Sequence, residues 1–241
     1  MAKGFPNVGA TVIDTSADLP TASAALEGVM MFQKDSNELK ICDGSSWVSV
    51  IDTDTPSGLN IITPTSVAGT GVSLSGAQVT FSSATTVSVN GCFNAAFNSY
   101  RIIIDSSTNT GGGQLRFKTR SGGSDSGGGY TTTGVDTYVS GGTGYTSPLG
   151  TGYQGIGYAV CGLLAAAAAR SLTTIDIYTP GTSTGYTIGN FLSSGASNTT
   201  GLENYVGSFI NYGGPTVDGF SVYTTGTNWT GTLRVYGNRN A

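Results

Sequence analysis

The segment from Gly28 to Val50, GVMMFQKDSNELKICDGSSWVSV, constrains the fold of this chain more than any other. It contains three short apolar runs separated by polar stretches, and the runs are 29–33, 39–42 and 47–50. Apolar runs bounded by Asp, Asn, Gly and Ser predict short strands joined by tight turns. A three-stranded piece of this size buries too little apolar surface to be stable alone. We therefore expect it to pack against copies of itself or a host surface, as an attachment or trimerisation device does.

The rest of the chain has the composition of a β-rich protein. Glycine accounts for 38 of the 241 residues, and charged residues make up only 10%. Beyond residue 67, about ten short apolar runs separated by turn residues predict an antiparallel β-sandwich similar to a jelly roll. The continuous run Tyr100–Asp105 predicts a central strand buried on both faces. The alanine-rich run Leu163–Arg170 is the one competing helical signal, and its shortness favours a brief excursion between strands.

These signals divide the all-β chain into three parts. We place an N-terminal β region for attachment or trimerisation at residues 1–55, a linker at 56–66 and the β-sandwich domain at 67–241. Pro56, Gly58 and Pro64 punctuate the linker. The start of the sequence lacks the apolar core of a signal peptide, and no apolar run is long enough to span a bilayer. We expect synthesis in the cytoplasm without membrane insertion.

The residue types that carry most enzyme chemistry are absent or scattered. The chain has no histidine, which excludes Ser–His–Asp and Cys–His nucleophile systems. Six acidic residues beyond the linker could supply paired carboxylates, as in glycosidases, but the sequence shows no recognisable pair. These residues are Asp105, Asp125, Asp136, Asp176, Glu203 and Asp218. We therefore expect no catalytic residue, no metal site and no cofactor.

The cysteines and the charge narrow the possible partners. Cys42, Cys92 and Cys161 are widely spaced and form no C-x-x-C motif, so they predict small buried thiols. The net charge of −4 argues against a nucleic-acid partner. The one basic cluster, at 116, 118 and 120, alternates with apolar or uncharged residues, which predicts the solvent face of a half-buried strand.

Four tyrosines near glycine-rich stretches are the candidate recognition residues: Tyr130, Tyr138, Tyr145 and Tyr153. A tyrosine ring offers a rigid apolar face and a hydroxyl, and Gly, Ser and Thr neighbours add adaptable hydrogen bonds. This mixture predicts a binding surface for a carbohydrate. The alternative is that these rings pack across strands within the sandwich or at a subunit seam.

Three stretches resemble bacteriophage virion appendage proteins, the family of tail fibres and fibre tips with a β-sandwich. A short repeat near the end of such proteins that joins the particle matches here at Gly28, Phe32, Asn37, Leu39, Asp43, Gly44, Trp47 and Val50. The strand Tyr100–Asp105 and the run Trp229–Gly237 are similar to a β-sandwich domain at the distal ends of phage virion proteins. The alternative interpretation of the first match is an ordinary β-meander in an extracellular protein.

The resemblance implies a virion structural protein that is made in the host cytoplasm and exposed on the particle. We expect a homotrimeric tail fibre or fibre-tip component whose N-terminal region joins other virion proteins and whose sandwich contacts a bacterial surface glycan. Phe32, Leu39, Trp47 and Val50 are the residues expected at the subunit or attachment seam. A capsid decoration protein or head fibre with a purely structural role is the alternative, and a depolymerase is a third.

Overall fold

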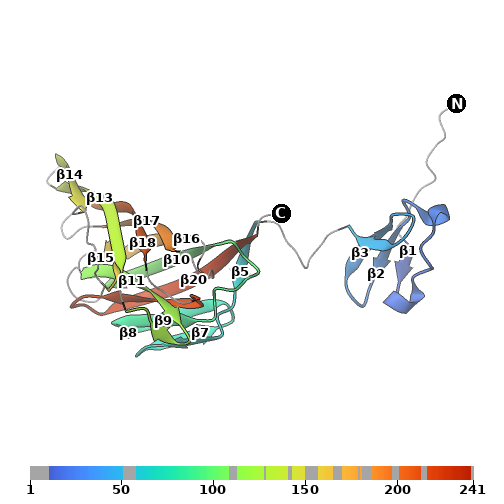
Figure 1. Cartoon of the computed structure of the whole chain (residues 1–241), viewed down its shortest axis with the longest axis horizontal. Coiled ribbons are helices and arrows are strands. Elements are labelled where there is room, and N and C mark those ends of the chain that lie inside the picture. Colours follow the sequence, from blue (N-terminus) through green and yellow to red (C-terminus); the bar gives the residue numbers. More distant parts are fainter. Residues whose placement is uncertain are drawn as a thin grey trace. The chain divides into compact units, whose positions relative to one another are not determined.

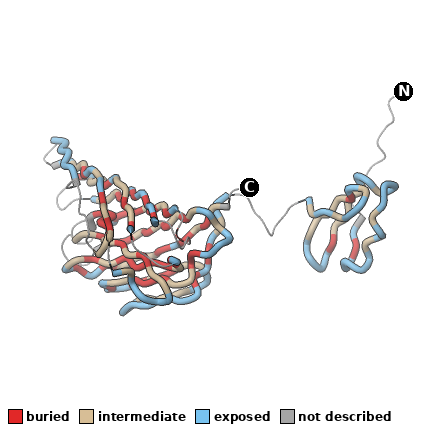
Figure 2. The backbone as a smooth tube through the Cα atoms, in the orientation of Figure 1, coloured by how far each residue is buried: buried red, intermediate tan, exposed pale blue. Residues whose placement is uncertain are grey.

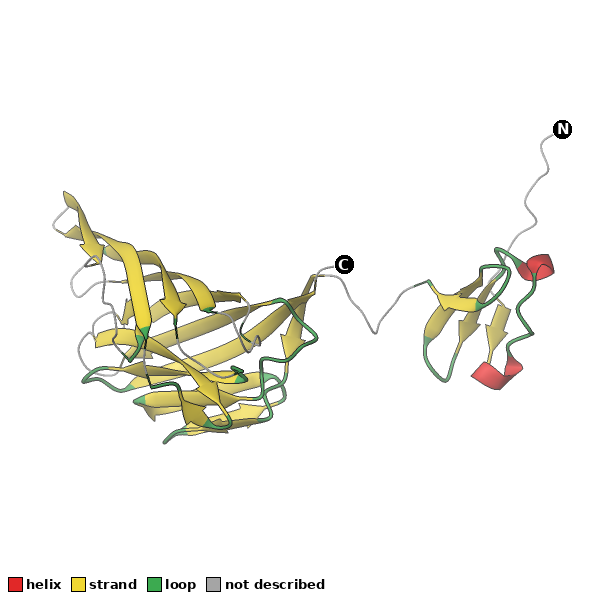
Figure 3. Cartoon of the chain, in the orientation of Figure 1, coloured by secondary structure: helices red, strands yellow, loops and turns green. Residues whose placement is uncertain are grey.

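The computed structural model describes residues 11–50, 58–108, 113–127, 129–140, 143–149, 157–164, 170–178, 180, 186–196, 201–212 and 216–239. The chain forms two compact units, Met1–Pro56 and Ser57–Ala241 (Figure 1). Both units consist mainly of strands and loops. The two 3-10 helices of the described residues belong to the first unit (Figure 3). The prediction of an all-β chain is confirmed. No helix within these ranges is long and apolar enough to cross a membrane.

The first unit is a four-stranded sheet with the order β1-β2-β3-β4. Its elements are β1 (Thr11–Ile13), β2 (Met30–Gln33), β3 (Glu38–Cys42), β4 (Trp47–Ser49) and the 3-10 helices η1 (Ser16–Asp18) and η2 (Ala24–Leu26). Strands β2, β3 and β4 form the antiparallel meander that the sequence predicts. In the turn before β4, the Asp43 carboxylate accepts backbone N–H bonds from Ser45 and Ser46 at 2.8 and 2.7 Å. Such an Asx turn explains the Asp at this position.

The second unit is a β-sandwich of two antiparallel sheets. The larger sheet has the order β14-β13-β18-β17-β16-β10-β20-β8-β7, with β5 also paired to β20. Its strands are β5 (Gly58–Ile62), β7 (Val72–Ser75), β8 (Gln78–Ala84), β10 (Ser99–Thr108), β13 (Tyr130–Ser140), β14 (Thr143–Leu149), β16 (Arg170–Tyr178), β17 (Thr187–Ala196), β18 (Leu202–Asn211) and β20 (Trp229–Arg239).

The smaller sheet has the order β12-β11-β19-β9-β6, with β15 also paired to β11. Its strands are β6 (Ser66–Ala68), β9 (Thr86–Asn90), β11 (Gly113–Ser121), β12 (Ser124–Asp125), β15 (Ala159–Leu164) and β19 (Gly219–Thr224). The predicted antiparallel sandwich is therefore confirmed as the architecture of this unit.

The core lies between the two sheets, and along many strands buried residues alternate with more exposed ones (Figure 2). On β10, Tyr100, Ile102 and Ile104 are buried, whereas Ile103 between them is only partly buried. The prediction that this strand is buried on both faces is wrong, because the smaller sheet covers one face and the other is at the surface. Trp229 and Phe81 pack within the core with ring centroids 4.3 Å apart.

All three cysteines are free and buried, as the sequence predicts. Cys92 and Cys161 lie in the sandwich core with no exposed surface. Burial raises the pKa of both thiols, because the low-dielectric interior disfavours the thiolate. These side chains therefore act as small apolar core residues.

Two segments differ from the sequence-based expectation. Strand β5 lies inside the range expected to be a linker, and it pairs with β20 so that Ile62 enters the core. The burial of Ile62 and the strand pairing of β5 therefore determine its structure, despite the Gly and Pro residues nearby. The alanine-rich run is bordered by strands, since β15 extends to Leu164 and β16 begins at Arg170. Residues 165–169 between them lie outside the described residues.

Two phenylalanine rings cover two glycines within the larger sheet. Phe191 is paired with Gly207 across β17 and β18, and Gly189 is paired with Phe209. A Cβ atom added to Gly207 would lie 2.5 Å from Phe191 Cζ and 2.3 Å from the carbonyl oxygen of Thr133. Real side chains do not approach this closely, so glycine is required where each ring lies flat against the backbone.

We predict that Gly207→Ala destabilises the sandwich by about 1–3 kcal/mol, the usual penalty for overpacking a filled site. Denaturant unfolding of the full chain would measure the change. Gly144→Ala is the matched control, since a Cβ at Gly144 meets nothing within 4 Å. It should change stability by less than about 0.5 kcal/mol. Equal effects of the two substitutions would contradict the packing described.

Candidate functional site

One face of the N-terminal sheet consists entirely of apolar side chains. The pairing registers place Val12, Phe32 and Leu39 side by side, and Met30, Ile41 and Val48 beside one another. Val50 continues this face, because its N–H donates to the Leu39 carbonyl at 2.7 Å. Val12, Val48 and Val50 are 54%, 41% and 47% exposed, and none of the seven is buried. These seven residues are the apolar face: Val12, Met30, Phe32, Leu39, Ile41, Val48 and Val50.

The opposite face of the same sheet is covered by the chain segment that contains η1 and η2. Ile13, Gln33 and Cys42 are buried there. Trp47 also lies on this covered side, where its Nε1 donates to the Pro20 carbonyl at 2.7 Å. Of the four residues expected at a seam, Phe32, Leu39 and Val50 lie on the apolar face. Trp47 does not, because it alternates with Val48 along β4.

In the sandwich, the four candidate tyrosines have different surroundings. Tyr130 is fully buried, and its hydroxyl accepts the Thr119 N–H at 2.7 Å. Asn211 Nδ2 lies 3.3 Å from the same hydroxyl, so Tyr130 is a hydrogen-bonded core residue. Tyr138 and Tyr145 are paired across the β13–β14 hairpin and stack with ring centroids 5.0 Å apart. Tyr153 lies outside the described residues.

Two carboxylates, Asp136 and Glu203, lie close to the stacked tyrosines. The sequence alone did not identify these two residues as a pair. Glu203 on β18 is paired with Tyr138 on β13, and Asp136 is paired with Tyr205 in the same two strands. Alternation places all four side chains on the same face of the sheet. With Tyr145 they form the acid–tyrosine corner: Asp136, Tyr138, Tyr145, Glu203 and Tyr205. A repeated acid-x-Tyr spacing, at 136/138 and 203/205, is the sequence signal that could have found it.

The carboxylates of the corner are desolvated. Asp136 is 8% exposed; its side chain hydrogen-bonds to Tyr205, and its Oδ1 has no hydrogen-bond partner within the described chain. Burial raises the pKa of Asp136. Burial and the nearby Asp136 charge both raise the pKa of Glu203. Glu203, which is only partly buried, is the carboxylate beside the half-exposed rings that the hydroxyl groups of a ligand can reach.

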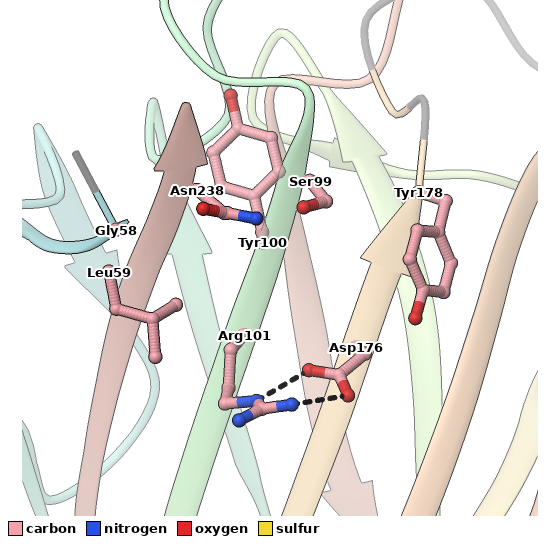
Figure 4. Close-up of a pocket in the computed structure, with 8 residues that line it drawn as sticks. All are labelled: Gly58, Leu59, Ser99, Tyr100, Arg101, Asp176, Tyr178 and Asn238. Atoms are coloured by element: carbon pink, nitrogen blue, oxygen red, sulfur yellow. Dashed lines mark hydrogen bonds and ion pairs between the residues drawn. The ribbon is translucent and has the colours of Figure 1, made fainter. Parts of the chain in front are cut away.

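A polar hollow, separate from the acid–tyrosine corner, lies on the outer face of the larger sheet and has a volume of about 270 Å³ (Figure 4). Arg101 Nε and Nη2 donate to the two carboxylate oxygens of Asp176 at 2.7 and 2.9 Å, and Tyr178 and Leu59 stand at the sides. In this bidentate ion pair, the positive charge of Arg101 is neutralised by the negative charge of Asp176. The hollow therefore presents no uncompensated charge to a ligand.

The described part of the chain contains no group of three or more His, Cys, Asp or Glu side chains placed to hold a metal. No protein-family model, no curated protein and no solved structure matches this chain.

We predict that Asp136→Asn stabilises the sandwich at neutral pH, because it removes a buried charge and keeps an acceptor for Tyr205. The raised pKa of Asp136 means that its ionised form destabilises the fold, and this penalty disappears as pH falls below the ordinary value of 3.8. The difference in unfolding temperature between variant and native protein should be positive at about pH 7 and shrink towards about pH 3.

Asp176→Asn is the matched contrast for this measurement. It removes the partner of Arg101 and should lower stability at neutral pH. A lower unfolding temperature for Asp136→Asn at neutral pH would show that the Asp136 carboxylate is stabilised by its surroundings instead.

Proposed function

We propose that this chain is a phage virion protein, a tail fibre or fibre-tip component, that associates through its N-terminal unit and contacts a host-surface glycan through its sandwich. The observation that carries the proposal is the apolar face, because seven apolar side chains, none of them buried, occupy one side of the sheet in the unit Met1–Pro56. The resemblance of the Gly28–Val50 segment to virion-joining repeats supports the same role for this unit.

The apolar face supports association of several copies. Fully burying one aliphatic or aromatic side chain stabilises an assembly by about 1.5–3 kcal/mol, and these side chains are already partly covered. Seven of them in one patch therefore provide a substantial driving force. The resemblance to fibre proteins is the reason for proposing a trimer. The apolar face by itself supports only association of copies through this surface, without setting their number. Neighbouring virion proteins would then bind the assembled N-terminal units.

The acid–tyrosine corner supports the adhesive role of the sandwich. Stacked tyrosines provide an apolar platform, and the partly buried Glu203 provides an acceptor for sugar hydroxyl groups. A capsid decoration protein with a purely structural role would use neither feature for a ligand. Counting the copies on the intact particle by cryo-electron microscopy separates the two functions. A few assemblies at the tail would support the adhesive function. Hundreds of copies over the capsid would instead identify a decoration protein.

We predict that Phe32→Asp dissociates the oligomer into monomers, because it places a charge in the centre of the apolar face. Sedimentation or light scattering of the full chain would measure the mass. Thr21→Asp, an exposed position on the segment that covers the other face, is the control and should leave the mass unchanged. A Phe32→Asp protein that keeps the native mass would place the interface elsewhere.

Trp47→Phe should have a different outcome. It removes the hydrogen bond to Pro20 but leaves the apolar face intact, so we expect a loss of about 1 kcal/mol in the stability of the N-terminal unit. The oligomeric mass should not change. Dissociation of this variant would mean that the covered side also takes part in the interface.

We predict that Tyr138→Ala weakens binding to susceptible cells roughly twofold to tenfold, the range expected for one aromatic contact. Binding of labelled protein to cells would measure the effect. Tyr212→Ala is the matched control, because Tyr212 and Tyr186 form another exposed tyrosine pair, with centroids 5.4 Å apart. Equal loss in both variants, or none in Tyr138→Ala, would exclude the corner as the contact.

A further inference from the structure

The outer face of the smaller sheet carries a pair of cations held among aromatic rings. Arg116 and Lys118 on β11 alternate with Leu115, Phe117 and Thr119, which are fully buried. The two cations therefore share the outward face, and residues two apart on a strand are about 6–7 Å apart. We call Arg116, Lys118, Tyr158 and Tyr223 the basic row.

The side chains of the basic row are fixed by local contacts. Arg116 Nε and Nη2 donate to Gln114 Oε1 at 3.2 and 2.9 Å. The guanidinium carbon lies 3.9 Å from the centre of the Tyr158 ring, and Lys118 Nζ lies 5.4 Å from the centre of the Tyr223 ring. Cation–π contacts orient both charges, and neither cation forms an ion pair with a carboxylate of the described residues. An ordered cation loses less conformational entropy when it binds a ligand.

The distribution of charge sets this row apart from the rest of the chain. Of ten lysine and arginine residues, the side chains of two, Lys3 and Arg239, lie outside the described set. Five of the remaining eight form ion pairs: Lys34, Lys40, Arg101, Arg120 and Arg170. Within the described chain, this leaves Arg116, Lys118 and Arg234 without a carboxylate partner, and the first two are neighbours.

Arg120, which continues the line of cations on β11, is neutralised. Its Nη1 pairs with Asp125 and also donates to Ser221 at 2.9 Å. The chain has more acidic than basic residues, yet among the described residues of this face only Arg120 is paired with a carboxylate. The adjacent cations Arg116 and Lys118 therefore repel each other. That repulsion is relieved when an anion binds between them.

We propose that the basic row binds the anionic groups of an acidic polysaccharide. Arg116 donates its Nε–H and one N–H of Nη2 to Gln114, and its remaining N–H groups can bind a carboxylate or phosphate. Lys118 adds a second positive charge, and the tyrosine rings offer apolar contact to sugar rings. The row is distinct from the acid–tyrosine corner, whose carboxylates would repel such a ligand. Nucleic acid is disfavoured by the net charge of −4 and by the small number of free cations.

Binding of the full-length protein to immobilised polymers tests the proposal without reference to any virion role. The probes are polygalacturonate for carboxylates, poly(glycerol phosphate) for phosphates, neutral dextran and single-stranded DNA. We expect retention of one or both acidic polymers at an ionic strength of about 0.01 M, weaker retention at about 0.15 M, and none of dextran. The preferred acidic polymer identifies whether carboxylate or phosphate is the natural group.

The variant R116Q/K118Q should lose about tenfold or more in affinity. R170Q/R234Q is the control for net charge, since it also removes two positive charges, here from exposed positions on the larger sheet, where Arg170 is paired with Asp105. This variant should bind like the native protein. Lys118→Ala alone, which disturbs no hydrogen bond of Arg116, should show a smaller loss in the same direction and guards against a folding defect. Equal losses in the two double variants, no retention of acidic polymers, or stronger binding of DNA would overturn the proposal.

Discussion

The pairing of β20 with both β10 and β8 is the interaction on which the sandwich depends. β10, β16, β17, β18, β13 and β14 lie on one side of β20 in the larger sheet, and β8 and β7 lie on the other. Its inward residues Leu233 and Val235 are fully buried in the core. Because β20 pairs with β10 and β8, which are far from it in the sequence, the two halves of the sheet join only when β20 is in place. Non-local pairing of this kind makes folding slow relative to helical proteins.

One rule of strand geometry places all the candidate sites. Along β13 and β18, inward positions begin with Tyr130 and Phe209 in the core and continue to Asp136 and Tyr205. The same alternation that buries apolar side chains thus directs carboxylates inward towards the end of these strands. On the smaller sheet it directs Arg116 outward. The acidic and basic features of the sandwich therefore belong to different faces, although each arises from the regular pleat of a strand.

Local patterns predicted local structure well. The alternation at 114–120 and the polar turns after β2 and β3 identified their elements, because each depends on neighbours in sequence. Features that depend on distant partners were missed. β1 has only three residues and is defined by its parallel pairing to β2, and β5 by its pairing to β20. The carboxylates of Asp136 and Glu203 are 67 residues apart in sequence, and only the register of β13 and β18 brings them together.

The three buried thiols make the folded molecule insensitive to the redox state of its surroundings. Thiol oxidation and disulfide exchange proceed through an accessible thiolate, and burial suppresses both the access and the ionisation of Cys92 and Cys161. The sandwich is held together by strand pairing and core packing, so it gains nothing from oxidation and loses nothing from reduction. A protein assembled in one redox environment and exposed in another keeps a single covalent structure throughout.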